Sequence, residues 1–282
     1  MRSPWFRRFA LIALIGLLIV GYGFSEARRD PAVHRTTIAM PDWPAGAPPV
    51  TVALLSDIHI GNQTMDATRL SRIVGQVNAL KPDYVMIAGD LIAGGHKGSA
   101  ATLGPAMIGP LSALSPRIGK IAVLGNHDHY TGAEIVRSQL TRAGFTVLDN
   151  QAASFGPLAI GGVGDQFSKH ADVKATVAAL APLPGAHLFL THSPGIARHL
   201  PTNSLLLAGH THCGQVVPAF IGELLLSGHP DLHYFCGEMH QPGHTVVVTA
   251  GLGTSILPLR LGAPPDFWLI RLGPATFSQS RP

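Results

Sequence analysis

The sequence is poor in charged residues, in cysteine and in repeated segments, and each shortage excludes a class of protein. Only 13% of its 282 residues are Asp, Glu, Lys or Arg, whereas 46% are hydrophobic. This balance excludes a disordered chain and favours a domain built around a buried sheet. Two cysteines, Cys213 and Cys236, are too few for a disulfide framework. The sequence does not decide whether these two cysteines form a single bridge. There is no internal repeat and no low-complexity segment.

Excess positive charge is also missing from most of the chain. Residues 1–35 hold six Arg against Glu26 and Asp30, and the remaining chain holds fourteen basic and fourteen acidic residues. The net charge of +4 therefore describes the N-terminus alone. A neutral remainder offers no basic surface, so we expect no nucleic-acid partner.

An uncharged apolar run from Phe9 to Phe24 follows three arginines near the N-terminus. Sixteen residues are short for a membrane span and long for a signal-peptide core. More positive charge precedes the run than follows it, which keeps the N-terminus inside the cell and moves the remainder across. We predict that residues 1–35 are a signal anchor or an uncleaved signal, with a periplasmic or otherwise extracytoplasmic domain. The alternative is a buried N-terminal helix of the domain itself.

The rest of the chain reads as one large domain. Residues 36–49 contain a segment rich in Pro, Gly and Ala and are predicted to be a linker, residues 50–273 form the domain, and residues 274–282 are a tail. Apolar strands alternate with stretches of helical periodicity up to Asn150, which is a parallel-sheet pattern. Three helices are expected in this part of the chain. The first follows the first strand, the second covers roughly 100–114, and the third covers 134–143. Later apolar runs predict strands of a second sheet.

Residues that can bind metals follow five of the apolar strands. They are Asp57 with His59, Asp90, Asn126 with His127, His192, and His210 with His212. Each alone is weak evidence, because such residues also serve in turns and caps. In an open α/β sheet, however, ligands bind outside the carboxyl ends of the strands. Carboxylates, imidazoles and an amide oxygen suit Mn, Fe or Zn, and the lack of thiolates argues against a structural Cys-based zinc site. The set is too large for one ion and fits two ions about 3.5–4 Å apart.

Together these motifs resemble the calcineurin-like metallophosphoesterases, in the branch with an N-terminal membrane segment. In chain order, the matching motifs are Asp57-Ile58-His59, Gly89-Asp90, Gly125-Asn126-His127-Asp128, His192 and Gly209-His210-Thr211-His212. The resemblance implies an α/β fold, a four-layer αββα sandwich with two mixed β-sheets. The chain departs from the branch at Cys213, where the branch usually has Gly.

The resemblance also implies a role for each motif residue. The implied ligands are Asp57, His59 and His212 for the first ion, Asn126, His192 and His210 for the second, and Asp90 as the bridge. His127 would be the general acid over the leaving group rather than a ligand, and Asp128 would orient its ring. A carboxylate behind an imidazole favours its protonated form, which is the form that gives a proton.

The implied reaction is hydrolysis of a phosphoester or pyrophosphate bond by a hydroxide that bridges two metal ions. A membrane-tethered domain suggests a lipid-linked or nucleotide-sugar substrate, such as UDP-2,3-diacylglucosamine of lipid A synthesis. That substrate is cytoplasmic, in conflict with an extracytoplasmic domain. The alternatives are a general phosphomonoesterase, a nucleotide phosphodiesterase or, in another class, a non-catalytic metal-binding scaffold. Every motif position is filled, which argues against the scaffold.

Four features have two readings each. His129 is a substrate contact or a plain loop residue, and Arg260 meets a substrate phosphate or makes a structural salt bridge. Cys213 tunes the site or only packs. The His-rich stretch 229–244 is a set of surface loops or a separate metal site.

Overall fold

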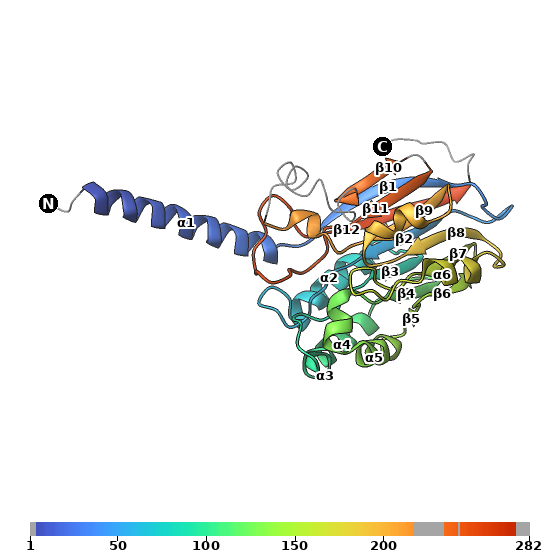
Figure 1. Cartoon of the computed structure of the whole chain (residues 1–282), viewed down its shortest axis with the longest axis horizontal. Coiled ribbons are helices and arrows are strands. Elements are labelled where there is room, and N and C mark those ends of the chain that lie inside the picture. The colour runs from blue at the N-terminus through green and yellow to red at the C-terminus, as the bar shows by residue number, and fades with distance from the viewer. Residues whose placement is uncertain (1–3, 217–233, 242, 275–282) are drawn as a thin grey trace.

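The computed structural model describes residues 4–216, 234–241 and 243–274, and it shows two six-stranded mixed sheets packed face to face (Figure 1). The predicted tail beyond Pro274, and His229 and His233 of the His-rich stretch, lie outside the described residues.

The first sheet has the strand order β1-β12-β2-β3-β4-β5. Its strands are β1 (Ala32–Met40), β12 (Asp266–Pro274), β2 (Val50–Leu55), β3 (Tyr84–Ala88), β4 (Gly119–Val123) and β5 (Thr146–Val147). Strands β2 to β5 are parallel, and β12 runs antiparallel to β2. The carboxyl ends of β2, β3 and β4 therefore share one edge of the sheet.

The second sheet has the order β10-β11-β9-β8-β7-β6. Its strands are β10 (Gly237–Gln241), β11 (His244–Val248), β9 (Ser204–Ala208), β8 (Ala186–Leu190), β7 (Leu158–Gly162) and β6 (Gln151–Phe155). The four central strands are parallel, so β8 and β9 also end at a common edge.

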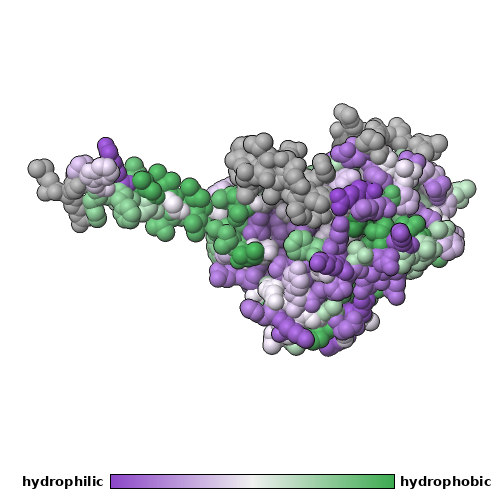
Figure 2. All heavy atoms as spheres, viewed as in Figure 1, coloured by the Kyte–Doolittle hydropathy of each residue, from purple (hydrophilic) through white to green (hydrophobic). Residues whose placement is uncertain are grey.

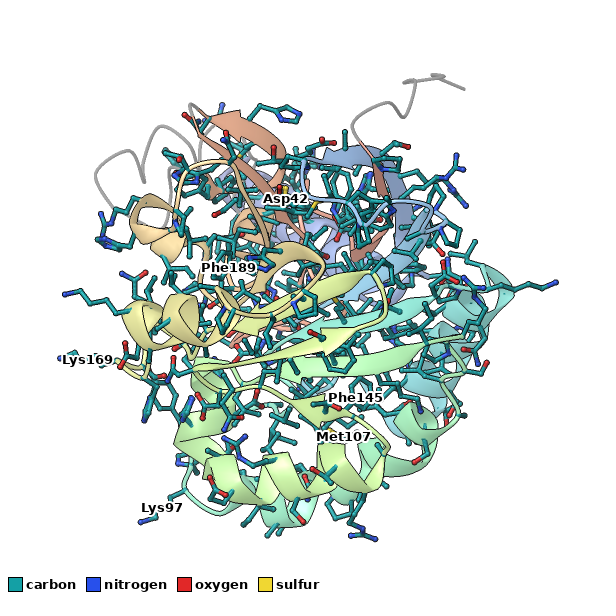
Figure 3. All side chains as sticks on the ribbon, turned by 90° about the vertical axis from the view of Figure 1, so that its right-hand side faces the viewer. Asp42, Lys97, Met107, Phe145, Lys169 and Phe189 are labelled. Atoms are coloured by element: carbon teal, nitrogen blue, oxygen red, sulfur yellow. A yellow bond between two sulfur atoms is a disulfide. The ribbon has the colours of Figure 1, made fainter. Side chains whose placement is uncertain are left out.

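Helices cover the outer face of each sheet and complete the four layers. The first sheet carries α2 (Ala67–Ala79), α3 (Ser99–Leu103), α4 (Pro105–Ser112) and α5 (Asn126–Arg142), and the second carries α6 (Val173–Leu180) and the 3₁₀ helix η1 (Pro194–His199). Figure 3 shows Met107 and Phe145 between the helices and the first sheet, whereas Lys97 and Lys169 project outward. Alternate residues of β2 face the two sides of its sheet, because side chains alternate along a strand: Leu54 packs between the sheets and Leu55 under the helices. The predicted αββα sandwich is confirmed.

Two boundaries differ from the sequence-based expectation. The strand β1 crosses the predicted junction between anchor and linker at residue 36, and it pairs with β12 over its whole length. Only the segment between Met40 and Val50 remains as a connection. The helix expected over 100–114 is two short helices that meet at Gly104, because Pro105 lacks the N–H that would continue the hydrogen bonding.

The helix α1 (Pro4–Arg28) contains the predicted apolar run and projects from the globular part (Figure 1). It is long and apolar enough to cross a membrane, and only 6% of its most apolar stretch of 18 residues is buried. Figure 2 shows its hydrophobic surface continuing to the point where it meets the domain. Protein covers α1 only near its domain end, at Gly23 and Ala27, so the rest of this apolar helix needs another apolar environment and is not a buried core helix.

Candidate metal centre

The ends of five strands, three from the first sheet and two from the second, meet at one point. The loops after β2 and β3 are joined by backbone hydrogen bonds, from Asp57 N to Gly89 O at 3.0 Å and from His59 N to Asp90 O at 3.1 Å. The two sheets are joined there by the amide of His210, which donates to Asp57 Oδ2 at 3.0 Å. The predicted ligands are therefore brought together by the packing of the sheets.

The first implied ligand group is assembled around Asp57. Its Oδ1 lies 3.2 Å from Nε2 of His212 and 3.8 Å from Nε2 of His59, and the two imidazole nitrogens are 3.3 Å apart. Asp90 Oδ2 lies 3.6 Å from the same nitrogen of His59. All three side chains of the group are buried and offer ligand atoms within 4.8 Å of one another, which is a spacing that one cation can bridge.

The second implied group is assembled around His192. Its Nε2 lies 3.2 Å from each of three atoms, namely Asp90 Oδ2, Asn126 Oδ1 and His210 Nδ1. Its other ring nitrogen, Nδ1, lies 2.7 Å from the carbonyl of Ala88. That hydrogen bond keeps the proton on Nδ1 and leaves Nε2 as the ligand atom. Because Asp90 touches both groups, it stands where the bridging carboxylate is expected.

Burial controls the charge of the imidazoles. Burial lowers the pKa of His59 to about 4 and that of His210 to about 4, and it lowers the pKa of His212 well below its ordinary value, with help from His59 and Arg260. These rings are neutral at pH 7, which is the form that binds a metal. Against the effect of burial, the charge of Asp90 and its hydrogen bond raise the pKa of His192 well above its ordinary value. The centre therefore favours positive charge at this point.

A buried carboxylate oxygen without a hydrogen-bond partner indicates, independently of the sequence motifs, that these residues fit a divalent cation. Asp57 is fully buried, and its Oδ1 has no hydrogen-bond partner. Burial raises the pKa of Asp57 to about 6. A buried carboxylate oxygen without a partner is costly, and a bound cation removes that cost. Neutral imidazoles, two carboxylates and an amide oxygen are ligands for Mn, Fe or Zn.

Backbone strain is concentrated at the same residues. Five of the predicted ligands have a positive φ: Asp57, His59, Asp90, His210 and His212. Such conformations cost about 1–3 kcal/mol each and persist where the surroundings enforce them. Gly251 shows how tightly the backbone is packed here, because a Cβ at this position, with φ of 79°, would lie 2.5 Å from Asp57 Cβ.

His127 lies beside the first ligand group but makes no hydrogen bond to Asp57, His59 or His212. Its ring makes an edge contact with that of His59, with 4.8 Å between centroids, and its Nε2 lies 3.4 Å from Ser255 Oγ. Its Nδ1 contacts the carbonyl of Gly94. His59, Asp90 and His127 also form a group whose ligand atoms lie within 4.8 Å of one another, so the ring is within reach of a cation bound there.

Asp128 does not stand behind the His127 ring as expected. Its carboxylate is fully buried and accepts four backbone N–H groups, from Asp90 at 2.9 Å, Leu91 at 2.9 Å, Ile92 at 3.2 Å and Gly125 at 2.9 Å. Asp128 lies in the first turn of α5 and caps the amide of Gly125 there, whereas the other three amides belong to the loop after β3, which packs against this turn. Gly94 takes the expected place on the ring, and Asp128 joins the loops after β3 and β4.

The family model of the calcineurin-like phosphoesterases matches residues 50–214, which is more than half of the chain and contains all of the implied ligands together with His127 and Asp128. The chain belongs to the calcineurin-like phosphoesterase family. It is 32% identical over 281 residues to the transmembrane protein with metallophosphoesterase domain of Danio rerio. That match covers 93% of this chain and 62% of the relative, so the chain spans less than two thirds of that protein.

Two bacterial relatives match over nearly their whole length. An uncharacterized metallophosphoesterase of Aquifex aeolicus is 30% identical over 247 residues, covering 85% of this chain and 91% of the relative. One of Bacillus subtilis is 30% identical over 271 residues, covering 91% of this chain and 92% of the relative. The chain thus belongs to a family of metal-dependent phosphoester hydrolases, and its α1 helix indicates membrane anchoring.

Arg260 is a structural residue of this phosphoesterase. It is fully buried, and its guanidinium donates to the carbonyls of Ala250 at 2.7 Å, Gly253 at 2.7 Å and Ala263 at 2.9 Å. It lies 3.5 Å from Nδ1 of His212, below the ligand group. Both expected partners, a substrate phosphate and a carboxylate, are replaced by backbone carbonyls, and the guanidinium holds the loop between β11 and β12 in place.

Cys213 and Cys236 form a disulfide, which decides the question that the sequence left open. The bridge fixes the segment that follows the implied ligand His212. His129 lies outside the ligand groups and stacks on His170, with 3.7 Å between ring centroids. In the described part of the His-rich stretch, His240 contacts Glu238 on the same strand, β10.

Sequence reasoning missed a buried acidic residue beside the second ligand group. Asp165 is fully buried, accepts a 2.6 Å hydrogen bond from Ser193 Oγ, and helps to raise the pKa of His192. The signal was present, because Asp165 follows β7 as the other acidic residues follow their strands. Gly94, the partner of His127, gave no signal in the sequence.

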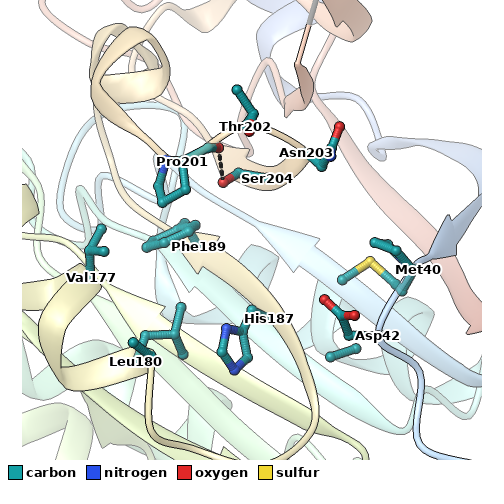
Figure 4. A pocket seen from close by; sticks show the side chains of 13 residues that line it. Met40, Asp42, Val177, Leu180, His187, Phe189, Pro201, Thr202, Asn203 and Ser204 are labelled. Atoms are coloured by element: carbon teal, nitrogen blue, oxygen red, sulfur yellow. Dashed lines mark hydrogen bonds between the residues drawn. The ribbon is translucent and has the colours of Figure 1, made fainter.

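A cleft of about 570 Å³ opens beside the metal centre and is lined by both His59 and His127. Its other walls come from residues 61–63, 93–95, 254–256 and 258, and from Tyr130. A second cavity of about 370 Å³ lies at the opposite ends of the strands, where Met40, Asp42, His187 and Phe189 line it (Figure 4). None of the predicted ligands lines this second cavity. Of the two cavities, only the first is lined by residues of the candidate metal centre.

Proposed function

We propose that the chain hydrolyses a phosphoester or pyrophosphate bond at a centre of two divalent metal ions, with His127 as the general acid. The observation that carries the proposal is the meeting of two ligand groups at Asp90, directly beneath a cleft that His127 lines. The proposed ligands are Asp57, His59 and His212 for one ion, Asn126, His192 and His210 for the other, and Asp90 for both.

Bound ions of this kind supply a hydroxide nucleophile at neutral pH and neutralise phosphate oxygens. The chain's own groups supply the rest. His127 binds the Gly94 carbonyl through Nδ1, so the proton that it can transfer sits on Nε2, on the cleft side. Hydroxide adds to phosphorus, the bond from phosphorus to the leaving oxygen breaks, and that oxygen takes the proton from Nε2 of the His127 imidazolium, which leaves a neutral ring. Asp128 supports the step by holding the loops of Asp90 and Gly125 together.

The test compares His127→Ala with His129→Ala in the metal-loaded, detergent-solubilised chain. His129 is the matched control, because it is a neighbouring imidazole on the same helix that lies outside the ligand groups. We expect His127→Ala to lower kcat on p-nitrophenyl phosphate or its bis ester by roughly 10²–10⁴-fold, with two ions retained. Unchanged turnover would refute the acid assignment. Loss of an ion would instead make His127 a ligand, as its distance from His59 and Asp90 permits.

The metal-binding scaffold is the second candidate function, and the same preparation tests it. Loading with Mn, Fe or Zn in turn identifies the ions that support turnover. Binding of two ions without cleavage of any phosphoester by the wild-type chain would favour the scaffold.

We further propose that the domain lies outside the cytoplasm. The arginines before the apolar run of α1 support this orientation, and so does the Cys213–Cys236 disulfide, because such bridges persist in oxidising compartments. On that side a cytoplasmic nucleotide sugar such as UDP-2,3-diacylglucosamine is out of reach, and an envelope lipid phosphate or a general phosphomonoester or phosphodiester is accessible. Alkaline phosphatase fused to the C-terminus should be active, whereas a cytoplasmic reporter fused there should not.

A further inference from the structure

The cleft beside the metal centre is built from the same loops that hold α1. Gln63 lines the cleft, and its carbonyl accepts a 3.2 Å hydrogen bond from Arg28 Nη1 in the last turn of α1. The segment 254–258 lines another wall and leads directly to Arg260, whose backbone N–H donates to the Gly23 carbonyl of α1 at 2.9 Å. Figure 1 shows this orange-red loop, between β11 and β12, at the domain end of α1.

The helix sets the height of that loop relative to a bilayer. The apolar run from Phe9 to Phe24 is sixteen residues and rises roughly 24 Å, against a hydrocarbon core of about 30 Å. Gly23 therefore lies near the end of the hydrocarbon region, and the charged residues from Glu26 onward lie among the headgroups. Because Gly23 packs against Leu259, Arg260 and Leu261, the loop lies at the same boundary.

The tip of the loop has features that folding does not explain. Ile256 is 96% exposed and Leu257 is 49% exposed, and both are large apolar side chains. Ile256 also has a φ of 53°, a region that disfavours β-branched residues and suits Asn or Gly. Arg28, exposed beside the loop, adds a positive charge of the kind that anionic headgroups attract.

We propose that the loop of residues 254–261 lies in the interface of the bilayer that α1 crosses, and that the cleft takes the phosphorylated headgroup of a membrane lipid. The lipid's chains stay in the bilayer beside Ile256 and Leu257, while its phosphate reaches His59 and His127 inside the cleft. The substrate part rests on the proposed phosphoesterase function. A lipid is the occupant that the continuity with α1 favours, because a soluble substrate gains nothing from an apolar rim at membrane height.

The first test measures the position of the loop without any turnover. Both cysteines are in the disulfide, so Ile256→Cys supplies the one free thiol for an environment-sensitive fluorophore. Ile118→Cys is the control, because Ile118 is an exposed isoleucine that precedes β4, at the amino end of that strand. In phosphatidylcholine vesicles the label at 256 should shift to the blue and be quenched by brominated lipids, whereas the label at 118 should stay water-like.

The second test measures turnover with Ile256→Asn, which removes the apolar side chain and suits the positive φ. The variant should therefore fold at least as well as the wild type. We expect the turnover of phosphatidic acid or a long-chain polyprenyl diphosphate in vesicles to fall roughly tenfold or more relative to the turnover of soluble p-nitrophenyl phosphate by the same variant. Ile118→Asn should leave both activities unchanged.

Several outcomes would overturn the inference. They are a water-like label at 256, equal losses on vesicle and soluble substrates, or wild-type cleavage of soluble esters with none of the vesicle lipids. If the metal-loaded wild type cleaves neither kind of substrate, the proposed function fails and the substrate part falls with it. The label at 256 still decides the position of the loop in that case.

Discussion

Asp128 offers the sharpest test of how this site is built, because its two possible roles give different results on substitution. As a partner of the His127 ring, it would matter for kcat and little for stability. As the acceptor of four backbone amides from Asp90, Leu91, Ile92 and Gly125, it matters first for stability. Asp128→Asn keeps the shape and removes one acceptor oxygen.

The magnitude follows from the hydrogen bonds. Each carboxylate oxygen accepts two amides, so an Asn side chain turns its NH₂ group toward two buried N–H donors. A buried donor without a partner costs roughly 1–3 kcal/mol. Burial and the nearby charge of Asp90 raise the pKa of Asp128 to about 7, so removal of the charge offsets part of this cost. We expect a net loss of roughly 2–4 kcal/mol in the free energy of unfolding.

The assay is thermal unfolding of the solubilised chain, followed by circular dichroism with metal added and removed. For a domain of this size the loss corresponds to a decrease in Tm of roughly 4–16 °C. Asp149→Asn is the matched control, because Asp149 is one quarter exposed and pairs with Arg137, and it should shift Tm by less than about 3 °C. A wild-type Tm together with a large loss of kcat in Asp128→Asn would refute the reasoning and restore Asp128 as the partner of His127.

The remaining predictions concern the metals, Arg260, Gly251 and the disulfide. Chelation should abolish turnover and lower Tm, and both should recover on addition of Mn, Fe or Zn. At a thousandfold excess over Kd, a bound ion should raise the free energy of unfolding by up to about 4 kcal/mol. An unchanged Tm on chelation would argue against bound ions. Arg260→Met should destabilise the chain by more than about 3 kcal/mol in a denaturant titration, because four buried carbonyls lose their donor, whereas a raised KM with wild-type stability would mean a substrate contact. Gly251→Ala should lower the metal content measured by mass spectrometry, because the added Cβ would displace Asp57, and full occupancy would contradict the packing. Replacing Cys213 and Cys236 by Ala should cost roughly 3 kcal/mol, since the bridge closes a separation of 23 residues, and no loss of Tm would show that the bridge adds no stability.

The fold was accessible from the sequence because its periodicities are strong. Buried parallel strands are continuous apolar runs, and those of β2, β3 and β9 are apolar throughout or nearly so. The strand β1 was missed because its sequence mixes polar and apolar residues, as an edge strand does, and only pairing with β12 makes it a strand. The helix expected over 134–143 is the second part of α5, because the backbone leaves the helical conformation at Gly132. The part from Asn126 to Thr131 was not expected, since its polar residues carry no apolar stripe.

The identities of the proposed ligands were determined by the sequence alone, because short motifs at strand ends hold both the residue types and their local spacing. Asp57, Asp90 and Asn126 could be placed at one sheet edge from the order of parallel strands. Tertiary structure decided what those motifs touch. Asp128 accepts four amides, three of which lie in the loop after β3, and the His127 ring contacts the carbonyl of Gly94 instead. The Arg260 guanidinium donates to backbone carbonyls beside the centre, and the cleft lies next to the domain end of α1. Such contacts join residues far apart in the chain, so only the packed molecule determines them.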